Sequence, residues 1–393
     1  MPRRSGVFAR ALQFLGLEAP TGLNMPRLPR ADAGRTDSKC RPRGVVRGLV
    51  AGLASMSAMT VSAHAAPWPV RAVIVTTFEV GHDTGDAPGE AQFWIERLHL
   101  TEKLDFPGGT HPILASPDHR IVLIETGMSL INAGISTMAL GLDPRFDLKQ
   151  AYWLVAGIGG IDPAAGAIGS AVWVQHTIND TAQEIDLREA PKGWAYARYV
   201  SDTHGPGTLE GAEHDLGPDG PYPLVFTLNP DLARFAWCHS RDKAVAASDD
   251  MKRFGVRYGG AAAQPPSVLL GDSFASDIYW HGAIQTHYAE DWVKLLTHGA
   301  GRFMISDMED SAVAEALWRL NRMGRASFDR LMILRTASNY TVQPPGETAI
   351  QSVLAPYPGG GKPAFEAAFR AGNAVLDALL ATWPAMPAKD TCR

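Results

Sequence analysis

Short apolar runs alternate with amphipathic stretches along most of this chain, and this alternation limits its fold more than any other feature. The runs are rich in Val, Ile and Leu and several lack polar alternation, which is typical of strands buried on both faces. The predicted strands are residues 72–77, 121–125, 153–156, 171–174, 268–270, 303–305 and 331–335. The predicted helices are residues 91–100, 130–140, 289–296, 310–323 and 365–380. Such an order predicts an α/β fold with a largely parallel central sheet.

The N-terminal segment differs in composition from the rest of the chain. Residues 1–47 carry ten Lys and Arg against three acids, and residues 48–70 carry no formal charge. A basic segment, a short apolar stretch and an A-x-A site at residues 63–65 match a secretory signal peptide. A disordered, Arg-rich leader is the alternative. We therefore expect a leader over residues 1–65 and a periplasmic or secreted protein.

The remainder, residues 66–393, is expected to form a single domain with an elaboration near residues 180–260. Removing the leader, which carries +7, takes the net charge from −5 to −12. This argues against a nucleic acid polymer as partner, because phosphate neutralisation needs a basic face. No later window is long and apolar enough to predict a membrane span. Cys238 and Cys392 can pair in an oxidising compartment, and two unpaired thiols are the alternative.

Small, polar and acidic residues follow several predicted strands. In open α/β sheets, ligands bind outside the carboxyl ends of the strands. The sequences there are TGMSLINAG, AGIGGIDP, GDSFAS, SDME and RTASNY. AGIGG lacks the G-x-G-x-x-G spacing of a dinucleotide site, and Ser129 lacks a G-x-S-x-G elbow. The histidines have no metal-ligand spacing, so no metal is expected.

The run ISDMEDSAVAEAL, residues 305–317, has two interpretations. Ser306 and Glu309 have the S-x-x-E spacing of a capping box ahead of an apolar helical stripe. Alternatively, Met308 and Glu309 at the mouth of a helix suit a sugar, because a carboxylate has two oxygens that accept hydrogen bonds from hydroxyls. Both interpretations stay open at this point.

Five motifs, taken together and in order, carry a resemblance to a known family. The stretches NAGISTMALGLDPRFDL, AYWLVAGIGGIDPAAGAIGSAVW, QEIDLREAP, IYWHG and LRTASNYTVQPPGET resemble the purine nucleoside permease (NUP) family. That family is related to the nucleoside phosphorylase and nucleosidase superfamily. The resemblance implies a three-layer, nucleoside phosphorylase-like fold with a largely parallel or mixed central sheet flanked by helices.

The resemblance also implies roles for individual residues. Glu309 would accept hydrogen bonds from ribose hydroxyls, with Met308 packed against the sugar. Phe274 would stack on the base, with a buried core position as the alternative. Gly127 and Ser129 would lie where related enzymes bind phosphate or the attacking water.

The catalytic positions implied by the resemblance are Glu90 and Asn339. Glu90 would activate water, although Glu79 competes for that role because the intervening loop is long. Ser338 and Asn339 correspond to a Ser-Asp pair in bacterial nucleosidases. An amide is not a general acid, but it can hydrogen-bond a purine ring nitrogen.

The expected function is binding of a purine nucleoside, with cleavage of its N-glycosidic bond by a nucleosidase or phosphorylase mechanism. No cofactor is expected, and phosphate is the co-substrate if the reaction is phosphorolysis. The alternative is a non-catalytic, soluble nucleoside-binding component of nucleoside transmembrane transport. The superfamily also implies a homo-oligomer.

Overall fold

The computed structural model describes residues 66–387 and Cys392, except residues 80, 181–182, 191, 193–195, 201–202, 205–207 and 212–214. The predicted leader, residues 1–65, lies outside this described part. No helix in the part that is described has both the length and the apolar character needed to cross a membrane.

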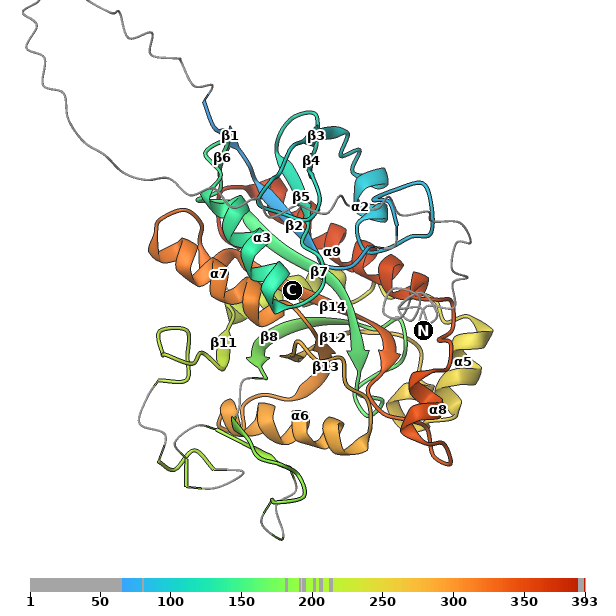
Figure 1. The fold of residues 1–393 in the computed structure, drawn as a ribbon. Helices are drawn as coiled ribbons and strands as arrows, with labels where there is room; N and C mark the ends of the chain where they lie inside the picture. Colours follow the sequence, from blue (N-terminus) through green and yellow to red (C-terminus); the bar gives the residue numbers. More distant parts are fainter. Residues whose placement is uncertain are drawn as a thin grey trace, which may run out of the picture. The chain divides into compact units, whose positions relative to one another are not determined.

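A ten-stranded mixed sheet is the centre of the fold (Figure 1). Its main path runs through β11 (Val225–Thr227), β8 (Ala171–Asn179), β12 (Val268–Ala275), β13 (Phe303–Asp307), β7 (Tyr152–Ile161), β2 (Ala72–Thr76), β5 (Ile121–Glu125), β4 (Ile113–Ala115) and β3 (Glu102–Leu104). The strands β2, β5 and β7 are parallel to one another, whereas β13 runs antiparallel to β7. The predicted α/β fold with a mixed sheet is therefore confirmed.

Strand β14 (Leu331–Tyr340) closes part of this sheet into a ring. It pairs in parallel with β7 along its whole length and antiparallel with β8 through Leu334–Thr336. Because β8, β12, β13 and β7 are already joined edge to edge, β14 completes a circuit of five strands. All ten residues of β14 are buried.

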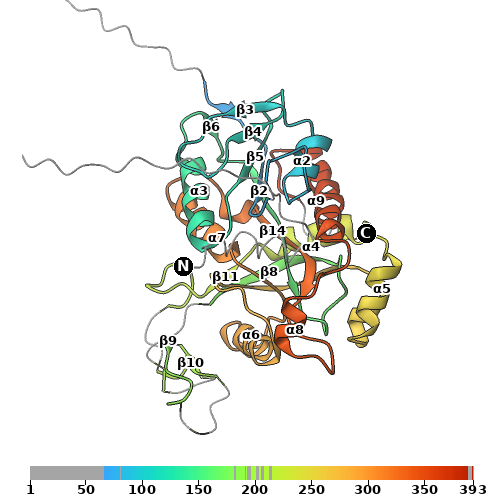
Figure 2. The same ribbon diagram turned by 45° about the vertical axis from the view of Figure 1, so that its right-hand side comes forward.

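Helices pack on both faces of the sheet, so the fold has three layers. On one face, α3 (Leu130–Leu142) and α7 (Asp310–Arg322) share an apolar core with β2, β5 and β7. On the other, α2 (Gln92–Arg97), α4 (Pro230–Ser240) and α9 (Lys362–Thr382) enclose a second core around Trp94, Tyr152 and Trp173. Figure 2 shows α9 and α2 on the side away from α3.

The remaining elements lie around this framework. They are α5 (Asp249–Val256), α6 (Ala283–Leu296), α8 (Ala349–Val353), the short helices η1 (Gly260–Ala263) and η2 (Phe328–Arg330), and the strand pairs β1 (Trp68–Pro69) with β6 (Phe146–Asp147) and β9 (Gln183–Glu184) with β10 (Arg198–Tyr199). Much of the segment near residues 180–260, expected as an elaboration, supplies β9, β10, β11, α4, α5 and η1.

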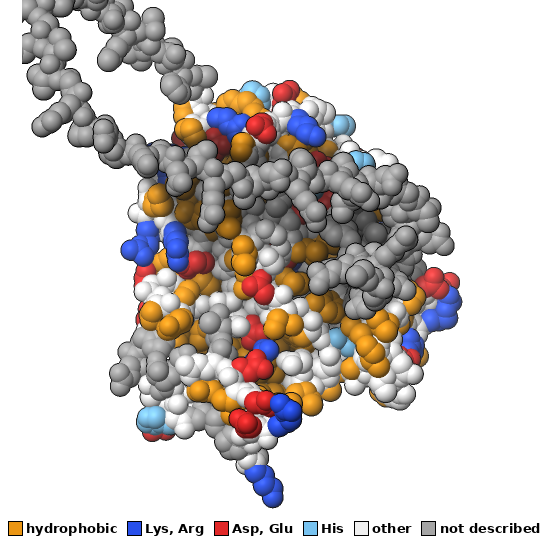
Figure 3. Space-filling model, viewed as in Figure 1, with side chains coloured by type: hydrophobic (Ala, Val, Ile, Leu, Met, Phe, Trp, Pro, Cys, Tyr) orange, Lys and Arg blue, Asp and Glu red, His pale blue; other side chains and the backbone are white. Residues whose placement is uncertain are grey.

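Acidic side chains (red) form a column down the middle of the face seen in Figure 3.

Several boundaries differ from the sequence expectation. The predicted strands beginning at residues 153, 171, 268 and 331 each continue for five residues beyond their expected ends. Gly, Ser and Asn in these continuations are typical of turns, but cross-strand hydrogen bonds of the ring hold them extended. Helices α4, α5 and α8 were not expected. Cys238 of α4 and Cys392 are joined in a disulfide, with Cα atoms 5.3 Å apart.

Candidate functional site

A cavity of about 390 Å³ lies at the carboxyl-terminal ends of β2, β7, β13 and β14. Its volume falls in the range of sites for small organic ligands. Its apolar wall comes from Phe78, Met128, Ile158, Ile278, Trp280 and Met308. Its polar wall comes from Thr77, Glu90, Tyr279, Ser306, Asp307, Glu309, Arg335, Ser338 and Asn339.

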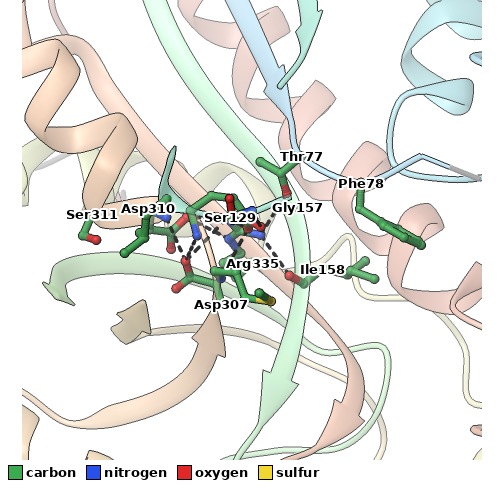
Figure 4. A network of polar contacts seen from close by, with 12 residues as sticks. Thr77, Phe78, Ser129, Gly157, Ile158, Asp307, Asp310, Ser311 and Arg335 are labelled. Carbon is green, nitrogen blue, oxygen red and sulfur yellow. Dashed lines mark hydrogen bonds and ion pairs between the residues drawn. The ribbon is translucent and has the colours of Figure 1, made fainter. Parts of the chain in front are cut away.

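Arg335 lies in the middle of the polar wall, and Figure 4 shows its guanidinium at the centre of the contact network. Its Nε donates to Asp310 Oδ1 at 2.8 Å, and its Nη2 donates to Glu309 Oε2 at 2.9 Å. Its Nη1 donates to the Ile158 carbonyl at 3.0 Å. Burial disfavours the charged guanidinium, but the carboxylates of Asp310, Asp307 and Glu309 outweigh it and raise the pKa of Arg335 well above its usual value. Arg335 is therefore a fixed positive charge.

Glu90 precedes α2 and is 4% exposed. Its Oε2 accepts hydrogen bonds from the Thr77 and Phe78 backbone N–H groups at 2.7 and 3.0 Å, and its Oε1 accepts one from the Ile158 N–H at 2.6 Å. Burial raises the pKa of Glu90 to about 7, with Arg335 opposing the rise. A carboxyl group with a pKa near neutrality can exchange protons efficiently at that pH.

Glu309 is also buried and lines the cavity. Its Oε1 accepts a hydrogen bond from the Ser129 N–H at 3.2 Å, and its Oε2 accepts from Arg335 and, at 3.3 Å, from the Met308 N–H. Burial raises the pKa of Glu309, and Arg335 opposes the rise. A carboxylate offers about four acceptor positions, so these three donors leave capacity for a ligand hydroxyl.

The capping-box interpretation of Ser306 and Glu309 is wrong. Glu309 is the N-cap residue of α7, and its side chain makes no capping hydrogen bond. Asp307 caps the helix instead, because its Oδ1 accepts from the N–H groups of Glu309 and Asp310 at 2.9 and 2.8 Å. The side chain of Ser306 donates to the Gly160 carbonyl at 3.3 Å.

Asn339 lines the cavity on β14, four residues beyond Arg335. Its Oδ1 accepts from the Ser338 hydroxyl at 2.9 Å, and its Nδ2 donates to the Tyr279 hydroxyl at 3.1 Å. These contacts fix the plane of the amide. Since an amide group both donates and accepts, it can read a heterocycle edge without transferring a proton.

Phe274 does not lie where the sequence analysis expected. It is 1% exposed and packs edge-on against Trp280, Tyr288 and Phe303, and it is not among the described residues that line the cavity. Successive side chains of a strand point to opposite faces, and in β12 the face carrying Phe274 is covered by α6. The aromatic side chains at the cavity are those of Phe78, Tyr279 and Trp280, and Phe274 packs edge-on against Trp280.

Gly127 and Ser129 lie beside the cavity, and Met128 between them lines it. Gly127 has a φ of 76° and Ser129 a φ of 89°, and a positive φ is unusual for Ser. Their N–H groups donate to Glu125 Oε1 at 3.1 Å and Glu309 Oε1 at 3.2 Å. The structure thus brings Glu90, Asn339, Met308, Glu309 and Ser338 to the cavity wall.

Several wall residues were not expected from the sequence. Arg335 ends an apolar run, LMILR, and a charge at the end of a buried strand signals a need for carboxylate partners. Tyr279 and Trp280 occur in IYWHG, which the sequence analysis quoted without a role. Glu79, the competitor of Glu90, accepts a hydrogen bond from the Ala91 N–H at 3.0 Å at the start of α2 and does not line the cavity.

Fold and site together define a mixed α/β protein with a ligand-sized cavity whose polar wall contains a buried arginine–carboxylate cluster. The chain belongs to the purine nucleoside permease (NUP) family, whose model matches residues 69–389. A purine nucleoside permease of Candida albicans is 28% identical over 335 residues, covering 80% of this chain and 75% of that protein. A probable purine nucleoside permease of Schizosaccharomyces pombe is 27% identical over 267 residues, covering 67% and 76%. The resemblance expected from the motifs is confirmed.

Solved structures similar to this chain include a futalosine hydrolase and a nucleosidase. The futalosine hydrolase of Helicobacter pylori is 12% identical, with a TM-score of 0.49, and the match covers 79% of this chain and 98% of that one. A 5′-methylthioadenosine/S-adenosylhomocysteine nucleosidase from Neisseria meningitidis is 16% identical, with a TM-score of 0.47, covering 79% and 99%. These similarities concern the fold.

Proposed function

We propose that this protein binds purine nucleosides and cleaves their N-glycosidic bond. One observation carries the proposal: a carboxyl group with a pKa of about 7, Glu90, lines the same ligand-sized cavity as the carboxyl group of Glu309 and the amide of Asn339. A purine nucleoside has hydroxyls at one end, a flat heterocycle at the other and a reactive carbon between them. The three polar side chains match these three parts.

The side chains of the polar and apolar walls have separate roles in this proposal. Glu309 accepts a hydrogen bond from a ribose hydroxyl, with Met308 packed against the sugar. Asn339 contacts the ring nitrogens of the base, and the apolar surfaces of Trp280 and Ile158 cover its faces. Glu90 takes up a proton on the side of the nucleophile.

Catalysis would come mainly from the two ends of the breaking bond. The sugar gains positive charge as the C–N bond lengthens, and the nearby carboxylates of Glu90 and Glu309 stabilise that charge. The purine gains negative charge. The Asn339 Nδ2 donates to the Tyr279 hydroxyl at 3.1 Å and to the Tyr340 carbonyl at 3.3 Å, and in this proposal it exchanges the Tyr279 contact for a hydrogen bond to the purine. These contacts strengthen as charge develops, which lowers the barrier rather than merely tightening substrate binding.

A non-catalytic role is the second candidate, and Asn339 favours it. An amide holds no transferable proton, so the leaving base receives no general acid from this position. The relatives from both fungi are named permeases. In that case the protein would be a nucleoside-binding component of uptake.

We also propose that the protein is exported. The expected signal peptide supports this, and so does the disulfide between Cys238 and Cys392, since such bonds persist in oxidising compartments.

The test of the function is release of free base from inosine, adenosine and guanosine by the full chain, with the Glu309→Gln variant beside it. We expect release by the wild type and a loss of about 10²-fold or more in kcat/KM for the variant, because a neutral amide does not stabilise the developing positive charge. Glu102→Gln, on the exposed strand β3, is the matched control and should retain full activity. Tight nucleoside binding without base release under any condition would establish the binding role instead.

A further inference from the structure

We infer that the nucleophile of this site is water and that inorganic phosphate is not its co-substrate. This inference rests on the proposed function, since it concerns which molecule attacks in the same cavity. Three observations carry it: the partners of the backbone N–H groups beside the cavity, the hydrogen bonds of the Arg335 guanidinium, and the excess of carboxyl groups on the cavity wall.

The backbone donors beside the cavity already have anionic partners. The loop at residues 126–130 turns through two positive-φ residues into the N-terminus of α3, a geometry that presents N–H groups to an anion. The Gly127 N–H donates to Glu125 Oε1 at 3.1 Å, and the Ser129 N–H donates to Glu309 Oε1 at 3.2 Å. The Leu130 N–H donates to Asp277 Oδ1 at 2.8 Å. Three carboxylates of the protein therefore occupy the places that a phosphate would take.

These carboxylates are held in position from behind. Glu125 is 3% exposed, and its Oε2 accepts from the Thr76 hydroxyl at 2.7 Å. Glu309 is tied to Arg335. Neither side chain can move away from its backbone donor without leaving buried polar groups unpaired.

Arg335 has no donor to spare for a phosphate. Of the residues described as lining the cavity, Arg335 alone is basic. Its Nε donates to Asp310 and its Nη2 donates to Glu309. The Nη2 also lies 2.7 Å from Asp310 Oδ1. Its Nη1 serves the Ile158 carbonyl and, at 3.4 Å, the Thr77 hydroxyl. The five N–H groups of a guanidinium are thus accounted for by the protein.

The charge on the cavity wall repels a dianion. Glu90, Asp307 and Glu309 line the cavity, and Asp310 lies directly behind Arg335. One guanidinium faces these four carboxyl groups, so a phosphate dianion would enter a site without positive excess. A neutral water molecule has no such penalty. It can donate a hydrogen bond to Glu90 Oε1, which among the described residues accepts from the Ile158 N–H alone.

The hydrolytic step balances with water alone. The water oxygen forms a bond to the anomeric carbon while one water proton passes to Glu90. The bond from that carbon to the purine nitrogen breaks, and its electron pair leaves with the purine. The purine takes a proton from solvent, and Glu90 returns its proton to solvent. The products are free ribose and free base.

The test follows base release from inosine by the full chain in phosphate-free buffer, with added phosphate, and in ¹⁸O-labelled water. We expect release without phosphate, ribose as the sugar product and the label at its anomeric hydroxyl. Release that requires phosphate and yields ribose 1-phosphate would overturn this inference and leave the proposed function standing. An absence of release under every condition would overturn both.

A variant tests the cause directly. Asp277→Asn removes one of the blocking charges at an exposed position, outside the wall of the cavity. Added phosphate should change the rate of base release by Asp277→Asn at lower concentrations than those that change the rate of the wild type. Asp147→Asn, on the exposed end of β6, should match the wild type. If the wild type responds to phosphate at the same concentrations as Asp277→Asn, the carboxylates do not exclude the anion and the inference fails.

Discussion

The guanidinium of Arg335 is 1% exposed and has Glu90, Asp307, Glu309 and Asp310 around it. A buried charge of this kind is tolerated only while its partners remain, because removing one partner leaves the others uncompensated. Arg335 therefore connects stability and function in one side chain. It keeps the carboxyl groups ionisable and holds Glu309 at the cavity wall.

The first prediction concerns Arg335→Met. We expect a loss of about 3–5 kcal/mol in the free energy of unfolding, as found when one partner of a buried ion pair is removed. Urea denaturation of the two proteins measures this. The control is Arg319→Met, which removes an i,i+4 pair at the surface between the exposed Arg319 and the half-buried Glu315 and should cost about 1 kcal/mol or less. Equal losses for the two variants would contradict the role of Arg335.

The second prediction concerns pH. Burial raises the pKa of Glu90 from 4.5 to about 7, and the proton acceptor is the ionised form. The value of kcat/KM should therefore fall as pH drops below about 7, and Glu90→Gln should lower kcat by roughly 10²–10⁴-fold and abolish that limb. Since the folded state holds this proton more tightly than the unfolded chain, Glu90 makes stability decrease as pH rises from about 4.5 to 7. A rate profile unchanged in Glu90→Gln would exclude Glu90 as the base.

The sequence predicted part of the wall. Met308, Glu309, Ser338 and Asn339 follow or end buried strands, where side chains meet at one sheet edge. The position of Phe274 was not predictable, because a shift of one residue in a strand exchanges the cavity face for the core face.

At the scale of elements, the glycines of β7 allow the ring to close around the site. A Cβ on Gly157 would lie 2.3 Å from Arg335 Nη1 and 3.2 Å from Glu90 Oε1. A Cβ on Gly159 would lie 2.5 Å from the Ser306 carbonyl of the neighbouring strand. These positions therefore require glycine for close approach, although glycine within a strand weakens it locally. This is why the sequence predicted that this strand ends at residue 156, whereas β7 continues to Ile161.

The third prediction compares two Gly→Ala substitutions. Gly157→Ala should destabilise the protein by about 1–3 kcal/mol through overpacking and should displace Arg335, with a loss of base release. Gly134→Ala, inside α3, meets its nearest neighbour at an ordinary 3.6 Å and should stabilise by about 0.5–1 kcal/mol. Thermal unfolding and base release measure both. A stabilised, fully active Gly157→Ala protein would refute the close approach.

At the scale of the whole molecule, the disulfide joins α4 to the end of the chain. Cys238 and Cys392 are separated by 154 residues, and the closed loop includes α6, β12, β13, α7, β14 and α9. Most of the cavity wall therefore lies within one covalent loop. Sequence left this pairing open, because the two thiols come together only through the packing of α4 against α9.

The fourth prediction is that reductant lowers stability. In the loop-entropy model, closing a loop of this length contributes about 5 kcal/mol to the free energy of unfolding. A reducing agent should therefore shift the urea midpoint of the wild type to lower concentration. The Cys238→Ser/Cys392→Ser protein should unfold at that lower midpoint with or without reductant. A wild-type midpoint that does not move with reductant would show that the disulfide contributes nothing.

Strand β14 sets the dimensions of whatever the cavity holds. Arg335 and Asn339 lie on it four residues apart, which corresponds to at most about 13 Å at the rise of an extended strand, because the register shifts between Ala337 and Asn339. Because β14 is hydrogen-bonded to β7 and β8, it cannot stretch or slide to suit another ligand. The strand thus fixes the spacing of these two side chains along the cavity wall, and in the proposed function Arg335 lies near the sugar and Asn339 near the base. Evolution or design can alter the side chains at positions 335 and 339. A ligand of another length, however, requires a new register of the strands throughout the ring.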